Sequence, residues 1–255
     1  MTRPNIIKII CHDIGKHLGC YGIKSVSTNS IDSLAKEGVL FNNSFATSPG
    51  CSPSRAAIAT GRYPHNTGVL GLAHAHFGWS LDKKIKHIAK YFSSNDYNSI
   101  LFGLQHVTYH EETLGFKKIF PERPADHVIK NIEDNIDTIL FKKPFYAEVN
   151  FFEPHRPFDF GGVKSYRSKG VFIPKYIPNN SSIKKEFEAM QGAIKKMDES
   201  VGKIINILKK NGLYENTIII FTTDHGIPFP RAKGTLYDAG IETGLIISYP
   251  KLKIK

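Results

Sequence analysis

One short stretch of the sequence brings together residue types that could attack and stabilise a tetrahedral anion. Cys51 is followed by Pro53 and Arg55, and the small residues up to Gly61 predict a short buried helix that begins at the cysteine. Unpaired backbone N–H groups and the helix dipole favour an anion at such an N-terminus. Arg55 lies one turn further on, where its guanidinium can reach back toward Cys51. A nucleophile, a cation and free donors therefore converge on one point.

The alternative is that Cys51 is only a small buried hydrophobe, which is the commoner role of a lone cysteine before a helix. The stretch from Cys51 to Pro64, about fourteen positions, closely resembles the signature of the sulfatase family. This resemblance implies that Cys51 is converted after translation to formylglycine, whose hydrated aldehyde is the nucleophile. It also implies a partner, either a formylglycine-generating enzyme or an anaerobic sulfatase-maturating enzyme.

Two aspartates, Asp13 and Asp224, each follow an apolar run that is typical of a buried strand. A single aspartate after a strand is often only a turn residue or a helix cap. Here each has a histidine beside it and a glycine shortly after, and the carboxyl ends of strands in an open sheet are where ligand groups gather. Because hard divalent cations prefer carboxylate oxygens, we predict one metal site with Asp13, Asp224, His225 and His12 as its ligands.

The metal turns depart from the pattern that the resemblance implies. The family commonly has two adjacent aspartates in the first turn, where this chain has His12-Asp13, and often Asp-Asn in the second, where it has Asp224-His225. Imidazole is a softer ligand than carboxylate and suits transition metals better. The resemblance favours Ca²⁺, and Mn²⁺ or Mg²⁺ remains open.

Three further site residues are implied by the same resemblance. His106 ends a segment that usually also carries a lysine, which is Leu104 here, and His155 and Lys233 match two other contacts with the sulfate. Arg55, Lys233 and the metal are then expected to stabilise the charge that develops. His155 or His106 is expected to protonate the leaving group.

Alternating strand and helix patterns must position these residues, and they predict an α/β fold with a mostly parallel sheet and helices on both faces. The resemblance implies an alkaline phosphatase-like sandwich. The predicted strands cover residues 5–10, 39–41 with 44–46, 98–102, 145–152, 217–221 and 245–249, and the predicted helices cover 28–37, 56–59, 82–93, 125–140 and 183–211.

Composition excludes several classes of protein. The chain of 255 residues allows one large domain or two small ones, and its three cysteines are too few and too scattered for a disulfide framework. The net charge of +11 could attract anionic substrates. Because the lysines are dispersed over predicted helix faces, we interpret the charge as that of an ordinary solvated surface. We find no nucleic-acid-binding module, no apolar run long enough for a membrane span and no signal peptide, and we expect a cytoplasmic protein.

The leading hypothesis is a metal-dependent sulfuric ester hydrolase that acts on a sulfated small molecule or glycan, in the branch of the family that includes heparan N-sulfatase-like enzymes. The first alternative is a phosphonate monoester or phosphodiester hydrolase on the same fold. The second is an inactive, truncated remnant. Because members of the family continue with a smaller C-terminal subdomain, we expect residues 1–255 to be a truncated N-terminal catalytic domain with an open cleft.

Overall fold

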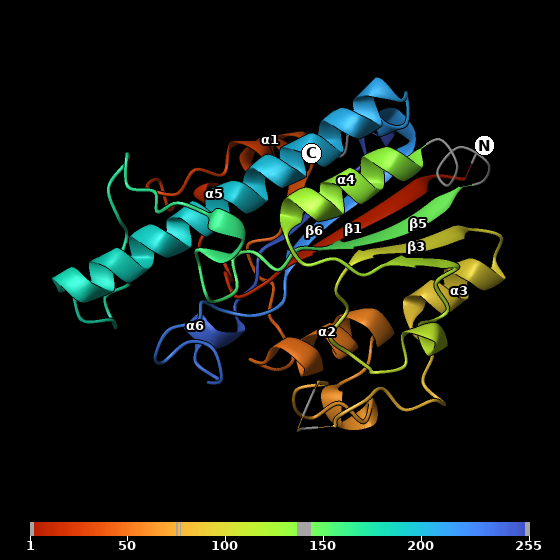
Figure 1. Cartoon of the computed structure of the whole chain (residues 1–255), viewed down its shortest axis with the longest axis horizontal. Helices are drawn as coiled ribbons and strands as arrows, with labels where there is room; N and C mark the ends of the chain where they lie inside the picture. Colours follow the sequence, from red (N-terminus) through yellow and green to blue (C-terminus); the bar gives the residue numbers. More distant parts are fainter. Residues whose placement is uncertain (1–2, 75, 77, 137–143, 253–255) are drawn as a thin grey trace.

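The computed structural model describes residues 3–74, 76, 78–136 and 144–252 (Figure 1). In this part of the chain seven strands form one sheet in the order β2-β7-β6-β1-β5-β3-β4. The strand β1 is parallel to both neighbours, β5 and β6, and β3 is parallel to β5 and β4, whereas β7 is antiparallel to β6 and to β2. The strands are β1 (Asn5–Cys11), β2 (Val39–Leu40), β3 (Asn98–Gly103), β4 (Lys118–Phe120), β5 (Phe145–Asn150), β6 (Thr217–Thr223) and β7 (Leu245–Ser248).

Helices cover both faces of the sheet, with α1, α4 and α5 on one face and α2 and α3 on the other (Figure 1). The helices are α1 (Asn29–Glu37), α2 (Cys51–Thr60), α3 (Ile88–Ser94), α4 (Ala125–Asn135), α5 (Ser181–Lys210) and α6 (Asp238–Ile241). No helix among the described residues combines the length and the apolar character needed to cross a bilayer.

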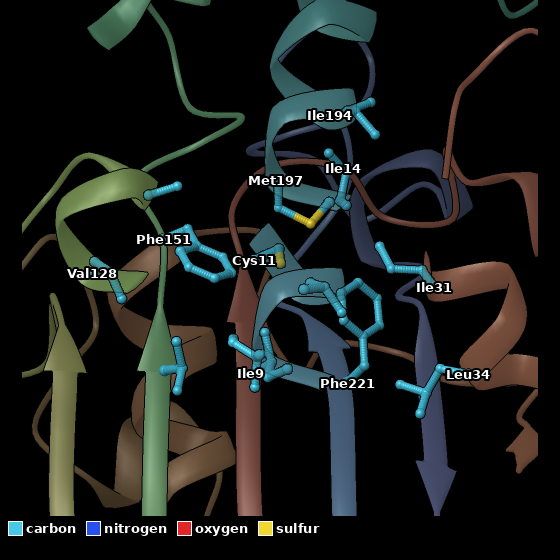
Figure 2. Packing of buried hydrophobic residues seen from close by; sticks show 14 of the residues in the cluster. Ile9, Cys11, Ile14, Ile31, Leu34, Val128, Phe151, Ile194, Met197 and Phe221 are labelled. Carbon is cyan, nitrogen blue, oxygen red and sulfur yellow. The ribbon is translucent and has the colours of Figure 1, made fainter. Parts of the chain in front are cut away.

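The main core lies between the sheet and the layer of α1, α4 and α5. Figure 2 shows Val128 of α4, Met197 of α5 and Leu34 of α1 around Ile9 and Phe221 of the central strands. Alternate residues of β1 point to this core because successive side chains of a strand face opposite sides of the sheet. The remaining residues of the central strands face α2 and α3, where the candidate site is built.

The predicted mostly parallel sheet with helices on both faces is confirmed. The predicted helix over 82–93 is wrong in its first half, because the structure has only α3. There the Asp82 side chain accepts a hydrogen bond from the Lys84 N–H, and His87 caps α3 by accepting from the Ala89 N–H. Such local bonds compete with helix continuation.

Two predicted strands are shorter than expected. The strand piece at 44–46 is reduced to a single bridge between Phe45 and Glu242, and the strand predicted over 145–152 ends at Asn150. The structure gives α4 as Ala125–Asn135, and the end of the helix predicted over 125–140 falls at residues 137–140, which lie outside the described residues.

Asp198 of α5 ties this long helix to the N-terminus of α1, since its carboxylate accepts hydrogen bonds from the Ser30 and Ile31 N–H groups at 3.1 and 2.9 Å. We expect Asp198→Ala to lower the free energy of unfolding by about 1–3 kcal/mol, because two buried donors lose their acceptor. Denaturant unfolding measures the loss. The control is Glu199→Ala, which removes only an exposed pair with Lys195 and should change stability by less than about 0.5 kcal/mol. Equal losses in the two variants would contradict the capping role.

Candidate active site

Cys51 is the first residue of α2 and is buried, with 2% of its surface exposed. Pro53 fits the first turn because a helix leaves its first N–H groups unpaired, and Gly61 ends the helix with a left-handed φ of 68°. The Ser54 hydroxyl donates to the Asp224 carbonyl oxygen at 2.5 Å. The N-terminus of α2 is therefore fixed against the carboxyl end of β6.

The two predicted metal aspartates meet beside Cys51 because they follow neighbouring parallel strands. The register pairs Cys11 of β1 with Thr223 of β6, so Asp13 and Asp224 emerge from the same edge of the sheet. The Asp13 N–H donates to Oδ1 of Asp224 at 2.9 Å, and Sγ of Cys51 lies 3.7 Å from Oδ1 of Asp13. Asp13 adopts a φ of 54°, a left-handed conformation that is uncommon for residues other than glycine but that aspartate adopts more readily than most.

The donor atoms at this edge fit a divalent cation. One ligand atom from each of His12, Asp13, Cys51 and Asp224 lies within 4.8 Å of the others, and all four residues are buried. Nδ1 of His12 is 3.2 Å from Oδ2 of Asp224 but is not aligned for a hydrogen bond, so both buried ring nitrogens are unpaired among the described residues. Nε2 of His225 lies 3.1 Å from Oδ1 of Asp13 and 3.2 Å from Sγ of Cys51. Two carboxylates with imidazole nitrogens are ligands that a divalent cation accepts.

Two permanent cations border the carboxylates. Nε of Arg55 donates to Oδ2 of Asp224 at 3.1 Å and its Nη1 donates to Oδ1 of Asn150 at 3.3 Å, while its buried Nη2 has no partner among the described residues. Nζ of Lys233 donates to Oδ2 of Asp13 at 2.7 Å. The unpaired Nη2 is a donor that a substrate anion could use.

The charges keep both carboxylates ionised. Burial alone would raise the pKa of Asp224, but His225 and Arg55 hold it well below its usual range. Burial would likewise raise the pKa of Asp13, which hydrogen bonding and charge from His225, together with Lys233, lower instead. Burial would lower the pKa of Lys233, whereas the negative charge of Asp13 raises it, so Lys233 is a cation at neutral pH. The site thus combines two carboxylates, Asp13 and Asp224, with a cationic partner for each, Lys233 and Arg55.

Three histidine rings line the mouth of the site. His155 follows β5, and its Nε2 lies 3.9 Å from Oδ2 of Asp13 with 29% of the side chain exposed. His106 follows β3 and is half-buried, and its ring centroid lies 5.2 Å from that of His12. Burial lowers the pKa of His106 to about 2, which keeps it neutral. His74, which carries no motif, is exposed and places its ring 5.4 Å from that of His106, at the rim.

His155 lines two cavities. One of about 430 Å³ borders the carboxylate and lysine, and its lining includes Asp13, His155, Arg156, Pro228, Phe229 and Lys233. The lining of the other, of about 660 Å³, includes His74, His106, Tyr109, Arg123, Phe152 and His155. His155 is therefore the side chain that both cavities share.

The family model described as Sulfatase matches residues 4–255. The chain belongs to the sulfatase family. It is 30% identical over 286 residues to an ulvan-active sulfatase of Formosa agariphila, covering 97% of this chain and 48% of that protein. It is 28% identical to the human N-sulphoglucosamine sulphohydrolase, covering 98% of this chain and 56% of that protein. This sulfatase chain thus spans about half the length of the curated relatives it matches.

Solved structures confirm the fold of this sulfatase. Ps i-CgsB in complex with k-i-k-neocarrahexaose superposes with a TM-score of 0.79 at 23% identity, over 99% of this chain and 67% of that one. The phosphonate monoester hydrolase of Agrobacterium radiobacter gives 0.76 at 20% identity, over 98% of this chain and 69% of that one. At these identities the likeness shows the fold alone.

All the residues predicted from the sequence lie at this one edge of the sheet, while their roles stay predictions: Cys51, Arg55, His106, His155, Lys233, Asp13, Asp224, His225 and His12. Sequence reasoning missed Asn150, which contacts Arg55. A signal was available, because Glu148 and Asn150 interrupt the apolar pattern of a central strand at alternate positions.

Proposed function

We propose that this sulfatase chain hydrolyses a sulfate ester or sulfamate on a sugar, with Cys51 matured to formylglycine. The observation that carries the proposal is the placement of Cys51 at a buried helix N-terminus, in contact with Asp13 and His225 and one turn from Arg55. The structure holds the unmodified cysteine, so Sγ stands for the side chain that formylglycine would present. When bound, a divalent cation supplies Lewis-acid contact with the sulfate oxygens, and the aldehyde hydrate supplies the nucleophilic oxygen.

The cations of this chain account for binding and charge stabilisation. The ammonium of Lys233 contacts Asp13, and Nη2 of Arg55, one helical turn after Cys51, has no partner among the described residues, so both side chains offer donors to a sulfate bound at Cys51. Such donors are fixed before the reaction, because Asp224 and Asp13 already hold the two side chains. Preorganised cations stabilise the charge that moves onto the leaving atom and the sulfate oxygens in the transition state.

His155 is the better of the two candidate proton donors. Its ring lies at the junction of the two cavities, where the bridging atom between the sulfate and the sugar would sit. The ring of His106 packs against that of His12, and its buried Nδ1 has no hydrogen-bond partner among the described residues. We therefore assign protonation of the leaving oxygen or nitrogen to His155 and a shaping role to His106.

The cavity of about 660 Å³ is proposed to hold the sugar. Tyr109 is half exposed there and offers an apolar face to a sugar ring, while Arg123 and His74 offer positive or hydrogen-bonding groups. Two relatives are named for ulvan and N-sulphoglucosamine, both of which are carbohydrates. A sulfated glycan is the substrate class that this combination supports best.

Two arguments about the identity of the cation point to different ions. Family resemblance favours Ca²⁺, whereas the imidazoles of His12 and His225 favour a softer ion such as Mn²⁺. We propose Ca²⁺, tested by dialysing the metal-free protein against equal concentrations of Ca²⁺, Mn²⁺ and Mg²⁺ and measuring bound metal and melting temperature. Preferential retention of Mn²⁺ would replace Ca²⁺ in this proposal.

The function is tested by turnover after mass spectrometry has verified conversion of Cys51. Aryl sulfate, N-sulfoglucosamine and an aryl phosphonate monoester are compared with each metal. The second candidate, a phosphonate monoester or phosphodiester hydrolase, is favoured by histidines in both metal turns, and faster phosphonate cleavage would support it. No turnover of any substrate by the converted, metal-loaded chain would support the remaining alternative, an inactive remnant. The cytoplasmic location stays a prediction.

The assignment of His155 makes a kinetic prediction. His155→Ala should lower kcat by about 10²–10⁴-fold for a sugar sulfate but by less than about tenfold for nitrophenyl sulfate, whose leaving group needs no proton. His110→Ala serves as the control, because His110 is exposed and its side chain pairs only with Glu112 among the described residues. Equal losses on both substrates would remove His155 from the proton-donor role and return it to His106.

A further inference from the structure

A row of polar side chains lies on the face of the sheet that α2 covers, where an apolar surface would be expected. Lys8 of β1 is the register partner of Glu148 of β5, and both are buried, with 5% and 3% of their surfaces exposed. Tyr146 and Asn150 stand two residues before and after Glu148 and so share its face. Buried charges are costly unless they are paired, which calls for an account of what this row does.

Glu148 is the centre of the row. Its Oε2 lies 2.9 Å from Nζ of Lys8 and accepts a hydrogen bond from the Tyr146 hydroxyl at 2.9 Å, while its Oε1 accepts from Nδ2 of Asn150 at 3.1 Å. Burial alone would raise the pKa of Glu148, but the charge of Lys8 lowers it to about 2. Glu148 is therefore a carboxylate, which can only accept hydrogen bonds.

The two neighbours of Asn150 determine which way its amide points. Glu148 accepts only, so Nδ2 must face it, and the guanidinium of Arg55 donates only, so Oδ1 must face Arg55. The flipped amide would set donor against donor and acceptor against acceptor. Asn150 thus presents a fixed acceptor to Nη1 of Arg55, and that orientation depends on the charge of Glu148.

Arg55 is held at two of its three nitrogens. Nη1 is bound by Asn150, and Nε is bound by Oδ2 of Asp224 at the candidate metal centre. A planar guanidinium anchored at Nε and Nη1 cannot rotate about its long axis, so Nη2 keeps one direction. Nη2 is the atom without a partner among the described residues.

We propose that Asn150, oriented by the Lys8–Glu148 ion pair, is a positioning residue that fixes the guanidinium of Arg55 for the reaction at Cys51. The kinetic consequence rests on the proposed function, whereas the placement of Arg55 does not. The chain of contacts runs from Lys8 to Glu148, Asn150, Arg55 and Asp224 without a break. The ion pair is thereby linked to the site across the strands β1 and β5.

The placement is tested by NMR without any turnover. The Nε–H signal of Arg55 is identified in protein labelled with ¹⁵N-arginine by its loss in Arg55→Lys. In Asn150→Ala this proton should exchange with water at least about tenfold faster, since Arg55 loses one of its two anchors. The control is Gln191→Ala. This variant also removes a buried amide, but that amide lies on α5, across the sheet, and makes three polar contacts of its own. An unchanged Arg55 signal in Asn150→Ala would overturn the proposal.

The kinetic arm separates positioning from general destabilisation. Asn150→Ala should lower kcat at least about tenfold with little change in KM, because misplacing Arg55 weakens contacts that matter most in the transition state. In N150D two carboxylates face each other and kcat should also fall. The double substitution N150D/E148Q reverses the direction of that hydrogen bond and keeps one negative charge, so it should recover most of the loss.

The outcomes of the two arms are distinguishable. If the unsubstituted, converted chain shows no turnover, the proposed function fails and the NMR result alone decides the placement of Arg55. If it turns over, full activity in Asn150→Ala, or no recovery in a folded N150D/E148Q variant, would overturn the positioning role. If Asn150→Ala fails to fold, recovery of kcat in N150D/E148Q relative to N150D still tests the positioning role.

Discussion

Replacing Cys51 by alanine is expected to abolish turnover, with a loss of kcat of at least about 10⁴-fold. The residue lies at the N-terminus of α2, one turn from Arg55 and beside the two aspartates that are predicted to bind the metal. No other described side chain occupies that position. Cys51→Ser should be a poor substitute, because a hydroxyl cannot form the hydrate that an aldehyde provides.

The same prediction has a chemical readout. After co-expression with a competent maturation enzyme, the tryptic peptide that contains Cys51 should show the mass loss expected for conversion of a thiol to an aldehyde. The matched control is Cys20→Ala, because Cys20 is half buried near α1 and lies outside the site, and this variant should keep its activity. If only unmodified cysteine is found and Cys51→Ala retains activity, Cys51 is not the nucleophile.

The candidate site could be predicted because its parts are local in sequence or follow from the rules of parallel sheets. The position of Arg55 relative to Cys51 is set by one helical turn. Asp13 and Asp224 lie close together because each follows an apolar strand and the two strands, β1 and β6, are parallel neighbours in the sheet. Neither the position of Arg55 nor the proximity of the two aspartates required knowledge of side-chain contacts.

Two features were missed because hydrophobic periodicity reports neither local hydrogen bonds nor the direction of a strand. The spacing of Ile85, Ile88 and Phe92 is helical, yet the caps made by Asp82 and His87 delay the helix until residue 88. Local hydrogen bonds outweigh a periodic pattern when the helix is short. The direction of β7, antiparallel to β6, likewise has no counterpart in the periodicity of its residues.

Asn150 illustrates the limit most clearly. A polar residue in a central strand can be recognised in the sequence as unusual. Its structural role, however, depends on Lys8 and Arg55, which lie more than ninety positions away along the chain. Only the register between β1 and β5 and the placement of α2 bring the three together. Paired buried polar residues can therefore be noticed in a sequence without being interpreted.

Removing the Asp224 carboxylate is expected to have the second large effect, because this one group belongs to the candidate metal site and also binds Arg55, the predicted catalytic arginine. It accepts hydrogen bonds from the N–H groups of Asp13 and His225 and from Nε of Arg55, and it lies 3.2 Å from His12. Asp224→Ala should lower kcat by at least about 10³-fold, reduce bound metal, and destabilise the fold by about 3–5 kcal/mol because Arg55 stays buried without its partner.

Asp13→Ala separates the two contributions. It removes a predicted metal ligand and the partner of Lys233 but leaves the contact between Arg55 and Asp224, so metal loss should be similar while the loss of stability is smaller. Elemental analysis gives the metal content, and denaturant unfolding with and without added metal gives the stability. The unsubstituted protein should gain about 2.7 kcal/mol at a metal concentration of 100 Kd, and neither variant should show that gain.

The control for both variants is Glu242→Ala, which removes a half-exposed carboxylate that pairs with Lys16 outside the donor cluster. Its metal content and its stabilisation by metal should match those of the unsubstituted protein. Stoichiometric metal in both Asp13→Ala and Asp224→Ala would mean that the two carboxylates do not share an ion. The ion pairs of Asp13 with Lys233 and of Asp224 with Arg55 would then be the reason for their burial, and the metal would have to lie elsewhere.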